Sequence, residues 1–301
     1  MKKTLYANGK LFIMGEYTVL DGSDAFALPT RFGQSLEVES NSTNSISWKS
    51  YDADGSLWLE VSIALEDVFA NTTNHGNKEA EMLIKVLRIA HAANPEVLVS
   101  GFDVVTKLTF PRNWGLGTSS TLISLVADWF GINPYKLLAQ TFGGSGYDIA
   151  CAQQQEPLIY NMNGGEPTVR TISFNPDFSD KLYFVYLNQK QNSREAIAAY
   201  REKEFDKQAL VAQINKLIEE VSTATDLSSF SSALEKQEAL LGGVLGIAPV
   251  QERLFPDFNG VVKSLGAWGG DFVLATAEED PTAYFTAKGF TTIVPYKEMV
   301  F

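Results

Sequence analysis

The stretch Pro111-Arg112-Asn113-Trp114-Gly115-Leu116-Gly117-Thr118-Ser119-Ser120 lies between a predicted strand, 102–108, and a predicted apolar helix, 121–130. Glycine lets backbone N–H groups approach an anion closely, and a helix N-terminus adds N–H donors and a partial positive charge. The stretch therefore predicts a cradle for phosphate groups. An ordinary loop that ends in a helix N-cap is the alternative interpretation. The pattern is no Walker loop, since no Gly-Lys-Ser/Thr ends it, and no dinucleotide fingerprint, since the G-x-G-x-x-G spacing is absent.

The composition of the chain narrows the class of protein. Its 301 residues, 45% hydrophobic and 20% charged, suffice for a packed core in one large domain or two ordinary ones. A formal net charge of -12 argues against bulk binding to nucleic acid or anionic membranes. The single cysteine, Cys151, excludes an intramolecular disulfide and a cysteine-based zinc cluster. No apolar run reaches the length of a membrane span. We expect a cytoplasmic protein that binds a small molecule, as a monomer or a homodimer.

The order of predicted elements divides the chain into two parts. The predicted strands are 5–8, 10–14, 34–40, 45–51, 57–63, 102–108, 158–161, 168–174, 182–187, 272–276 and 291–294. The predicted helices are 78–93, 121–130, 134–142, one long helix from about 193 to about 221, and 228–241 ended by Gly242-Gly243. A shift in composition at Asn175-Pro176-Asp177 predicts a boundary near residue 178. The expected domains are therefore 1–178 and 179–301.

Two further glycine-containing segments lie far from the cradle in sequence. They are Gly9-Lys10-Leu11-Phe12-Ile13-Met14-Gly15-Glu16-Tyr17 and Lys263-Ser264-Leu265-Gly266-Ala267-Trp268-Gly269-Gly270-Asp271. With the cradle between them, their order and spacing resemble the three motifs of the GHMP small-molecule kinases, over nearly the whole chain. The first segment looks like the mevalonate-kinase form Gly-Lys-x-x-x-x-Gly-Glu-His, with Tyr17 in place of histidine. The cradle looks like Pro-x-x-x-Gly-Leu-Gly-Ser-Ser, with Thr118 in place of the first serine.

The segment Gly144-Ser145-Gly146-Tyr147-Asp148-Ile149-Ala150 resembles the Gly-Ser-Gly-Tyr/Phe-Asp-Val-Ala of phosphomevalonate kinases. The Gly-Gly-Asp that ends the third motif is similar to that of the bacterial phosphomevalonate kinases. The resemblance implies a two-domain α+β fold, with a strand-rich N-terminal α/β domain and a ferredoxin-like C-terminal domain. It also implies ATP-dependent phosphorylation of a small anionic metabolite of the mevalonate or phosphomevalonate type, with Mg²⁺.

The candidate catalytic residues are Asp148 and Lys10. Phosphoryl transfer asks a protein mainly for positioning and charge neutralisation, and a carboxylate can take the proton of a hydroxyl acceptor. Asp148 is the candidate base, and the resemblance nominates Lys10 to keep it ionised and to stabilise charge on the γ-phosphoryl group. A turn or N-cap aspartate and a solvated strand-edge lysine are the plain structural alternatives.

The resemblance also implies binding residues. Those for the nucleotide are Pro111, Trp114, Gly115, Leu116, Gly117, Thr118, Ser119 and Ser120, and Ser119 can also offer its hydroxyl to Mg²⁺. Those for the substrate are Glu16, Tyr17, Ser145, Gly146, Ser193, Arg194, Gly266, Ala267 and Gly269. Two further roles stay open, because Trp114 and Trp268 could each stack on a base, fill the pocket or serve as core residues.

Two other functions remain open at this point. The predicted helix 134–142 offers Gln140 where a mevalonate kinase has a Mg²⁺-binding glutamate. The alternatives are therefore a related kinase for another small alcohol, such as a sugar or amino-acid-like substrate, and a nucleotide-binding regulatory protein without turnover.

Overall fold

The computed structural model describes residues 2–70, 77–163, 166–189, 193–268 and 270–301, with the backbone alone at 163, 193 and 194. The chain forms two compact units, each built from several segments. The first unit is Met1–Gly9, Phe32–Arg112 and Leu116–Gln153, and the second is Lys10–Arg31, Asn113–Gly115 and Gln154–Phe301. The chain therefore passes between the units several times, including twice within the cradle. A single boundary near residue 178 stays a prediction.

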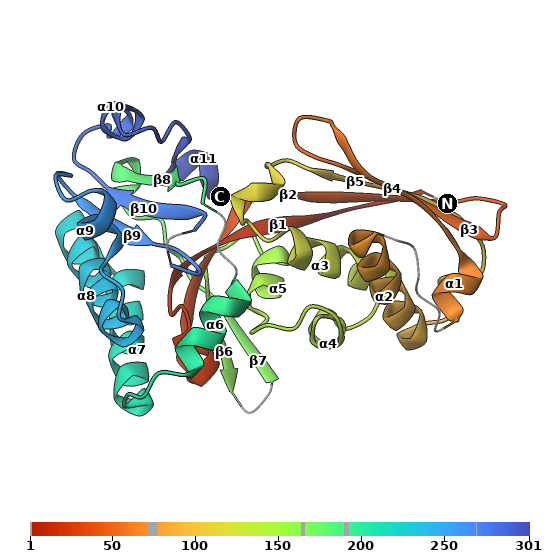
Figure 1. The fold of residues 1–301 in the computed structure, drawn as a ribbon, viewed down its shortest axis with the longest axis horizontal. Helices are drawn as coiled ribbons and strands as arrows, with labels where there is room; N and C mark the ends of the chain where they lie inside the picture. The colour runs from red at the N-terminus through yellow and green to blue at the C-terminus, as the bar shows by residue number, and fades with distance from the viewer. Residues whose placement is uncertain (1, 71–76, 164–165, 190–192, 269) are drawn as a thin grey trace. The chain divides into compact units, whose positions relative to one another are not determined.

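The first unit is built on a mixed sheet in the order β4–β3–β5–β2, with β1 paired to β2 (Figure 1). Its strands are β1 (Lys2–Met14), β2 (Ala25–Ser40), β3 (Ser45–Tyr51), β4 (Leu57–Ala64) and β5 (Phe102–Leu108). Strand β3 alternates buried and half-buried side chains, which is why its limits are legible in the sequence. The β3–β5 pair is parallel, whereas β2–β5 and β3–β4 are antiparallel. A doubly wound parallel sheet is thereby excluded.

Helices gather on one side of these strands (Figure 1). They are α1 (Leu65–Phe69), α2 (Lys78–Ala93), α3 (Thr118–Phe130), α4 (Pro134–Gln140) and α5 (Tyr147–Ala152). The Asn77 side chain caps α2 by accepting from the N–H groups of Glu79 and Ala80. Helix α2 contacts β4 and α3, and α3 contacts α4 and α5. One apolar core, which includes Trp48 from β3 and Ile84 from α2, joins the sheet to the helices.

The second unit holds an antiparallel sheet in the order β11–β8–β10–β9. Figure 1 labels β8, β10 and β9 of this sheet. Its strands are β8 (Leu182–Tyr186), β9 (Val261–Ser264), β10 (Phe272–Thr276) and β11 (Ile293–Pro295). Numbered along the chain, this order is 4-1-3-2, with helices between the first and second strands and between the third and fourth. That is the β-α-β-β-α-β arrangement of ferredoxin-like domains, so this part of the prediction is confirmed.

The other elements of the second unit complete it. The helices are α6 (Ser193–Arg201), α7 (Lys207–Ser222), α8 (Leu227–Leu245), α9 (Val250–Leu254), α10 (Thr282–Ala287) and α11 (Tyr296–Met299). Helix α8 packs on β9 and on α7. The hairpin of β6 (Leu158–Asn163) and β7 (Glu166–Thr171) pairs with the first residues of β2.

Two predicted helix limits in this unit are wrong. The long helix from about 193 to 221 is two helices, because Asp206 accepts a bond from the N–H of Ala209 at 3.0 Å and starts α7 afresh. The pair Gly242-Gly243 does not end α8. The helix continues to Leu245 and ends at Gly246, whose φ of 71° is the left-handed cap conformation. Glycine has a low helix propensity, but the packing of α8 outweighs that cost here. The pair Gly242-Gly243 therefore does not end the helix, although it is a common signal for a helix end.

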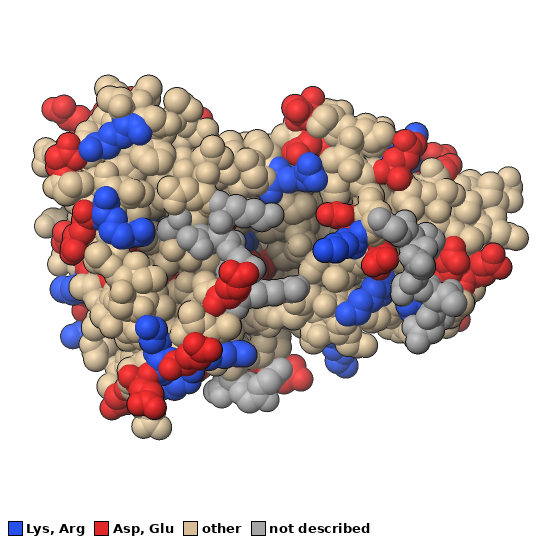
Figure 2. Space-filling view, viewed as in Figure 1, with Lys and Arg blue, Asp and Glu red and all other residues tan. Residues whose placement is uncertain are grey.

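Charged side chains of both signs are interspersed on the face that Figure 2 displays. No broad basic surface is visible among the described residues on that face. Within the described part of the chain, none of the helices has the length and apolar character required to span a bilayer.

Candidate functional site

The cradle has the backbone that a phosphate site needs. After a short 3-10 turn, η2 (Arg112–Trp114), Gly115 and Gly117 adopt φ values of 68° and 97°. Helix α3 begins at Thr118, three residues earlier than the sequence pattern indicated. Its ladder starts with the Thr121 N–H, which donates to the Gly117 carbonyl at 2.9 Å. The N–H groups of the residues before Thr121 lie ahead of the first i→i−4 hydrogen bond of α3. They are therefore the groups that can donate to a bound anion.

Some hydroxyls at the start of α3 form hydrogen bonds within the protein, and one is exposed to solvent. Ser120 is 6% exposed and donates to the Gly117 carbonyl at 2.8 Å. Thr121 donates to the Gln34 Oε1 atom at 2.7 Å, which ties the start of α3 to β2. Ser119 is exposed in the first turn of α3, so its hydroxyl is accessible to a ligand or a cation.

Gly115 has a second reason to be glycine. A Cβ atom built on it would lie 1.8 Å from the Oδ2 atom of Asp271. Asp271 ends the third glycine motif, and sequence reasoning did not select it as a site residue. Its proximity means that a side chain at position 115 must displace this carboxylate before any effect on a phosphate is felt.

Aromatic packing fixes the start of the cradle within the second unit. The Tyr186 hydroxyl donates to the Asn113 carbonyl at 2.8 Å. The Trp114 ring lies edge-on to Phe272, with centroids 5.4 Å apart, and 6.2 Å from the ring of Tyr186. Burial raises the pKa of Tyr186, and the nearby Asp271 carboxylate adds to this. Trp114 thus packs on β8 and β10, and its contact with a nucleotide base stays a prediction.

Other cradle residues make contacts within the first unit. Leu116 is 1% exposed, and Pro111 is half-buried. The Arg112 guanidinium lies over the Trp58 ring at 4.5 Å and donates to the Asp52 Oδ2 atom at 2.9 Å. Sequence reasoning gave no role to Asp52, because its partner is 60 residues away in the chain.

The Asp148 segment resembles the cradle in its use of glycine. Gly143, Gly144 and Gly146 have φ values of 71°, 110° and 90°. Gly146 is the N-cap of the short helix α5, and Asp148 lies half-buried in its first turn. Ser145 is also half-buried. The predicted loop therefore forms and presents Asp148 at a helix start.

Lys10, the other candidate catalytic residue, is half-buried in the middle of β1. It belongs to the second unit and Asp148 to the first. Their pairing stays a prediction.

The predicted substrate residues fall into three groups. Gly266, with a φ of 64°, and Ala267 are half-buried in the loop after β9. Ser193 and Arg194 form the start of α6 by backbone alone, and Gly269 lies outside the described residues. Glu16 and Tyr17 are 1% and 7% exposed. Substrate contact by any of these residues stays a prediction.

Glu16 belongs to a buried group that we name the Lys263 cluster. Its members are Glu16, Gln237, Glu238, Lys263 and Ser264, none of them more than 3% exposed. The Lys263 ammonium donates to Glu16 Oε1 at 2.6 Å and to the Ser264 carbonyl at 2.7 Å. The Gln237 amide donates to the other oxygen of Glu16. Lys263 pairs with Glu16 across 247 residues, which is why no local sequence pattern indicated the pair.

Burial dominates the electrostatics of this cluster. Desolvation raises the pKa of Glu16, and the Lys263 ammonium opposes that rise. Desolvation raises the pKa of Glu238 to about 7; Lys263 opposes the rise, and the Glu16 carboxylate adds to it. Glu238 accepts from the Ser264 N–H at 3.1 Å. The cluster thus contains two carboxyl groups and one ammonium in a low-dielectric interior.

The candidate site residues suit nucleotide phosphates better than they suit Mg²⁺ on its own. The cradle offers backbone donors next to positive-φ glycines, which suits phosphate oxygens. Among the described residues, no group of three or more His, Cys, Asp or Glu side chains could hold a metal ion. Mg²⁺ in phosphoryl-transfer sites commonly takes one or two protein oxygens, and phosphates and water supply the rest. The Ser119 hydroxyl therefore fits a cation that arrives with a nucleotide.

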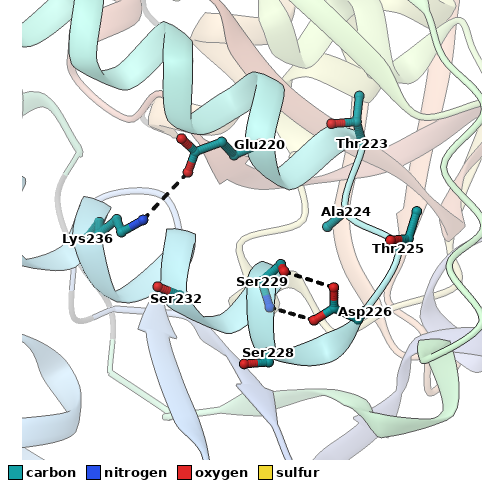
Figure 3. Close-up of a pocket in the computed structure, with 9 residues that line it drawn as sticks. All are labelled: Glu220, Thr223, Ala224, Thr225, Asp226, Ser228, Ser229, Ser232 and Lys236. Carbon is teal, nitrogen blue, oxygen red and sulfur yellow. Dashed lines mark hydrogen bonds and ion pairs between the residues drawn. The ribbon is translucent and has the colours of Figure 1, made fainter.

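An open hollow of about 580 Å³ lies at the turn between α7 and α8 (Figure 3). The residues around it are mostly hydroxyl-bearing or charged: Glu220, Thr223, Ala224, Thr225, Asp226, Ser228, Ser229, Ser232 and Lys236. Asp226 accepts from the Ser229 N–H at 2.8 Å and so acts as the N-cap of α8. None of the predicted site residues lines this hollow, and its polar groups are explained by the helix turn.

Comparison with solved structures identifies the fold of the chain. No family model matches the chain, and no curated protein matches it by sequence. Solved structures match it over nearly its full length. Mevalonate kinase from Methanococcus jannaschii is 16% identical, with a TM-score of 0.72, over 96% of this chain and 95% of that one.

Two other solved structures have different substrates. Phosphomevalonate kinase from Streptococcus pneumoniae, in complex with phosphomevalonate and AMPPNP, is 15% identical with a TM-score of 0.72, over 97% of this chain and 99% of that one. Galactokinase from Lactococcus lactis, in complex with galactose, is 14% identical with a TM-score of 0.70, over 95% of this chain and 88% of that one. At these identities the likeness establishes the architecture. The chain has the α+β fold of the GHMP kinases.

Proposed function

We propose that the protein is an ATP-dependent small-molecule kinase that phosphorylates an anionic metabolite of the mevalonate or phosphomevalonate type. The observation that carries the proposal is the cradle, where two glycines with positive φ lead directly into the N-terminus of α3. A fold shared with kinases, one of them in complex with AMPPNP, supports ATP as the phosphoryl donor.

The cradle would bind the nucleotide through its backbone. The N–H groups at the start of α3 would donate to phosphate oxygens, and the helix dipole would add a partial positive charge. The exposed Ser119 hydroxyl would complete the coordination of Mg²⁺ together with phosphate oxygens. When bound, Mg²⁺ neutralises negative charge on the transferred group.

Asp148 would act as the general base for an alcohol acceptor. Its carboxylate would take the hydroxyl proton while the acceptor oxygen bonds to the γ-phosphorus and the bond from that phosphorus to ADP breaks. Lys10 would hold Asp148 ionised and stabilise charge on the γ-phosphoryl group. If the acceptor is a phosphate, it is already ionised, so Asp148 matters less and Lys10 more.

A coupled ADP-release assay tests this function. The purified protein is assayed with ATP and Mg²⁺ against mevalonate, phosphomevalonate and galactose in turn. We expect turnover with mevalonate or phosphomevalonate, and no acceptor-dependent ADP release with galactose.

Each other outcome would lead to a different conclusion about the function. Turnover with galactose alone would support the kinase class and contradict the anionic substrate. ATP binding with no turnover on any acceptor would contradict the kinase and favour a nucleotide-binding regulatory protein. The absence of ATP binding would contradict the cradle itself.

A further inference from the structure

The Lys263 cluster places a buried ion pair between two of the glycine-containing motifs. Glu16 follows Gly15 in the first motif, and Lys263 begins the third. Both side chains are almost wholly inaccessible to solvent, at 1% and 0%. Removing two charges from water is costly, and apolar residues of similar size often stabilise a fold as well as a buried ion pair does. The pair therefore needs an explanation other than stability.

Glu16 directs both of its carboxylate oxygens inward. Oε1 accepts from the Lys263 ammonium at 2.6 Å, and Oε2 accepts from the Gln237 amide of α8. These bonds fix the carboxylate in position and orientation. Tyr17 is the next residue in the chain after this fixed side chain.

Glu238, the next residue on α8, holds the end of β9. Its Oε1 accepts from the Ser264 N–H at 3.1 Å, and its Oε2 lies 3.4 Å from both the Ser264 hydroxyl and the Val250 N–H. The Lys263 ammonium donates to the Ser264 carbonyl on the same strand. The point at which the chain leaves β9 for the loop with Gly266 and Trp268 is therefore fixed.

The residues that follow the two anchored points share an unusual backbone. Tyr17 and Trp268 have positive φ values of 61° and 51°, which aromatic residues rarely adopt. Both are buried in one hydrophobic cluster with Leu241. Such conformations persist only where the surrounding structure enforces them, and they concentrate at functional sites.

A further contact extends this arrangement to α6. The Tyr17 ring stacks on that of Tyr200, with centroids 5.2 Å apart. The Tyr200 hydroxyl donates to Asp21 Oδ2 at 2.6 Å, and the Lys207 ammonium donates to Asp21 Oδ1 at 2.9 Å. Tyr200 lies at the end of α6, the helix that begins with Ser193.

We propose that Lys263 is a positioning residue for the acceptor site. Its ion pair with Glu16 sets the turn of the first motif against the loop of the third and holds Tyr17 and Trp268 in their positive-φ conformations. On this account Glu16 orders the site through Lys263 and does not contact the acceptor. The inference rests on the proposed kinase function and assigns the acceptor side of that site to these segments.

Three variants separate positioning from stability. Lys263→Met leaves the buried Glu16 carboxyl without its cation and hydrogen-bond donor, so it should lower the melting temperature strongly. Glu16→Gln keeps the size of the side chain but removes its charge, and it leaves one acceptor oxygen where the carboxylate offers one to Lys263 and one to Gln237. The double variant Glu16→Gln/Lys263→Met removes both charges and should recover most of the melting temperature. Lys288→Met, which breaks the partly exposed pair of Lys288 with Asp257, is the matched control.

The kinetic readout uses the acceptor identified for the wild type. We expect the double variant to show an acceptor KM at least tenfold higher, with AMPPNP affinity within threefold of the wild type. Recovered folding together with a raised KM would support positioning. A wild-type acceptor KM in the stable double variant would overturn it. If the Lys263 variants do not fold, Glu16→Gln carries the same test and should raise KM in the same direction.

A structural readout keeps the inference independent of the proposed function. If the wild type phosphorylates no acceptor, the proposed function fails, but a crystal structure of Glu16→Gln or of the double variant still tests the positioning. We expect the φ of Tyr17 or of Trp268 to become negative. Unchanged backbone conformations at both residues would overturn the inference.

Discussion

The cradle and the Lys263 cluster are built in opposite ways. The cradle works through its backbone: glycine conformations and the first turn of α3 create it, and its Ser119 hydroxyl is exposed. The Lys263 cluster works through side chains that solvent does not reach. This difference indicates whether a substitution in each region should change function or stability. Changes at the candidate catalytic residues Asp148 and Lys10 should alter turnover, whereas changes in the Lys263 cluster should first alter stability.

The largest expected effect concerns turnover. Asp148→Asn keeps the shape of the side chain and removes the base, so with an alcohol acceptor kcat should fall roughly 10²- to 10⁴-fold. AMPPNP affinity should stay near that of the wild type, and Lys10→Met should also lower kcat. Steady-state kinetics and calorimetry measure both quantities. Asp128→Asn, at an exposed position of α3, is the control.

The double variant of Asp148 and Lys10 sharpens this prediction. If the two residues act as one unit, the double variant should lose less than the product of the single losses. Fully multiplicative losses would contradict the pairing.

The next effect tests whether Gly115 is constrained by packing. Gly115→Ala should destabilise the protein by about 3 kcal/mol, because the new Cβ atom meets the Asp271 carboxylate and the backbone is left-handed. Adding Asp271→Ala should restore part of that stability. Gly55→Ala is a matched control, since Gly55 has a φ of 81° and open space around it. Equal losses at positions 55 and 115 in urea unfolding would show that Asp271 plays no part.

A smaller effect depends on pH and belongs to the cluster. The pKa of Glu238 in the folded protein is about 7, above its ordinary value of 4.5. Its contribution to stability is therefore complete below pH 4.5 and is lost as the pH rises through 7, because the charged form is disfavoured by burial. Glu238→Gln should be more stable than the wild type at pH 8, by on the order of 2–3 kcal/mol, and similar at pH 4.

Urea unfolding at pH 4, 6 and 8 measures this difference. Glu235→Gln, at an exposed position of the same helix, should show no such pH dependence. A Glu238→Gln variant that is less stable than the wild type at pH 8 would contradict the assigned cause.

The smallest effect concerns the support under the cradle. Thr121→Val removes the hydroxyl that donates to Gln34 at 2.7 Å while keeping the shape of the side chain. The unfolding free energy should fall by about 1–2 kcal/mol, because Gln34 is buried and loses its donor. The same change at the exposed Thr168 of β7 should have no measurable effect. Equal values for the two variants would show that the contact is not stabilising.

Sequence patterns predicted features that depend on local chemistry. The limits of α2, β3, β5 and β10 follow from apolar periodicity and caps, and the glycines of the cradle and of the Asp148 loop have the positive φ values that their motifs indicated. The ferredoxin-like strand order came from the family resemblance and is confirmed.

Features that depend on distant partners were not predictable from one sequence. Lys263, Asp271 and Tyr186 gain their meaning from contacts with residues far along the chain. The break between α6 and α7 was missed because the polar residues around Asp206 suit a helix as well as a cap. The continuation of α8 through Gly242 was missed because packing outweighed a local stop signal.

The central claim is that the backbone of the cradle binds nucleotide phosphates, and one titration tests it most directly. AMPPNP with Mg²⁺ is titrated calorimetrically into the wild type and into Gly117→Val, with circular dichroism to verify the fold of both. Gly117 has a φ of 97°, so a branched side chain there should disturb the entry to α3 and obstruct the approach of a phosphate. The account predicts binding to the wild type and none to the folded variant. Equal affinity in both proteins would contradict it.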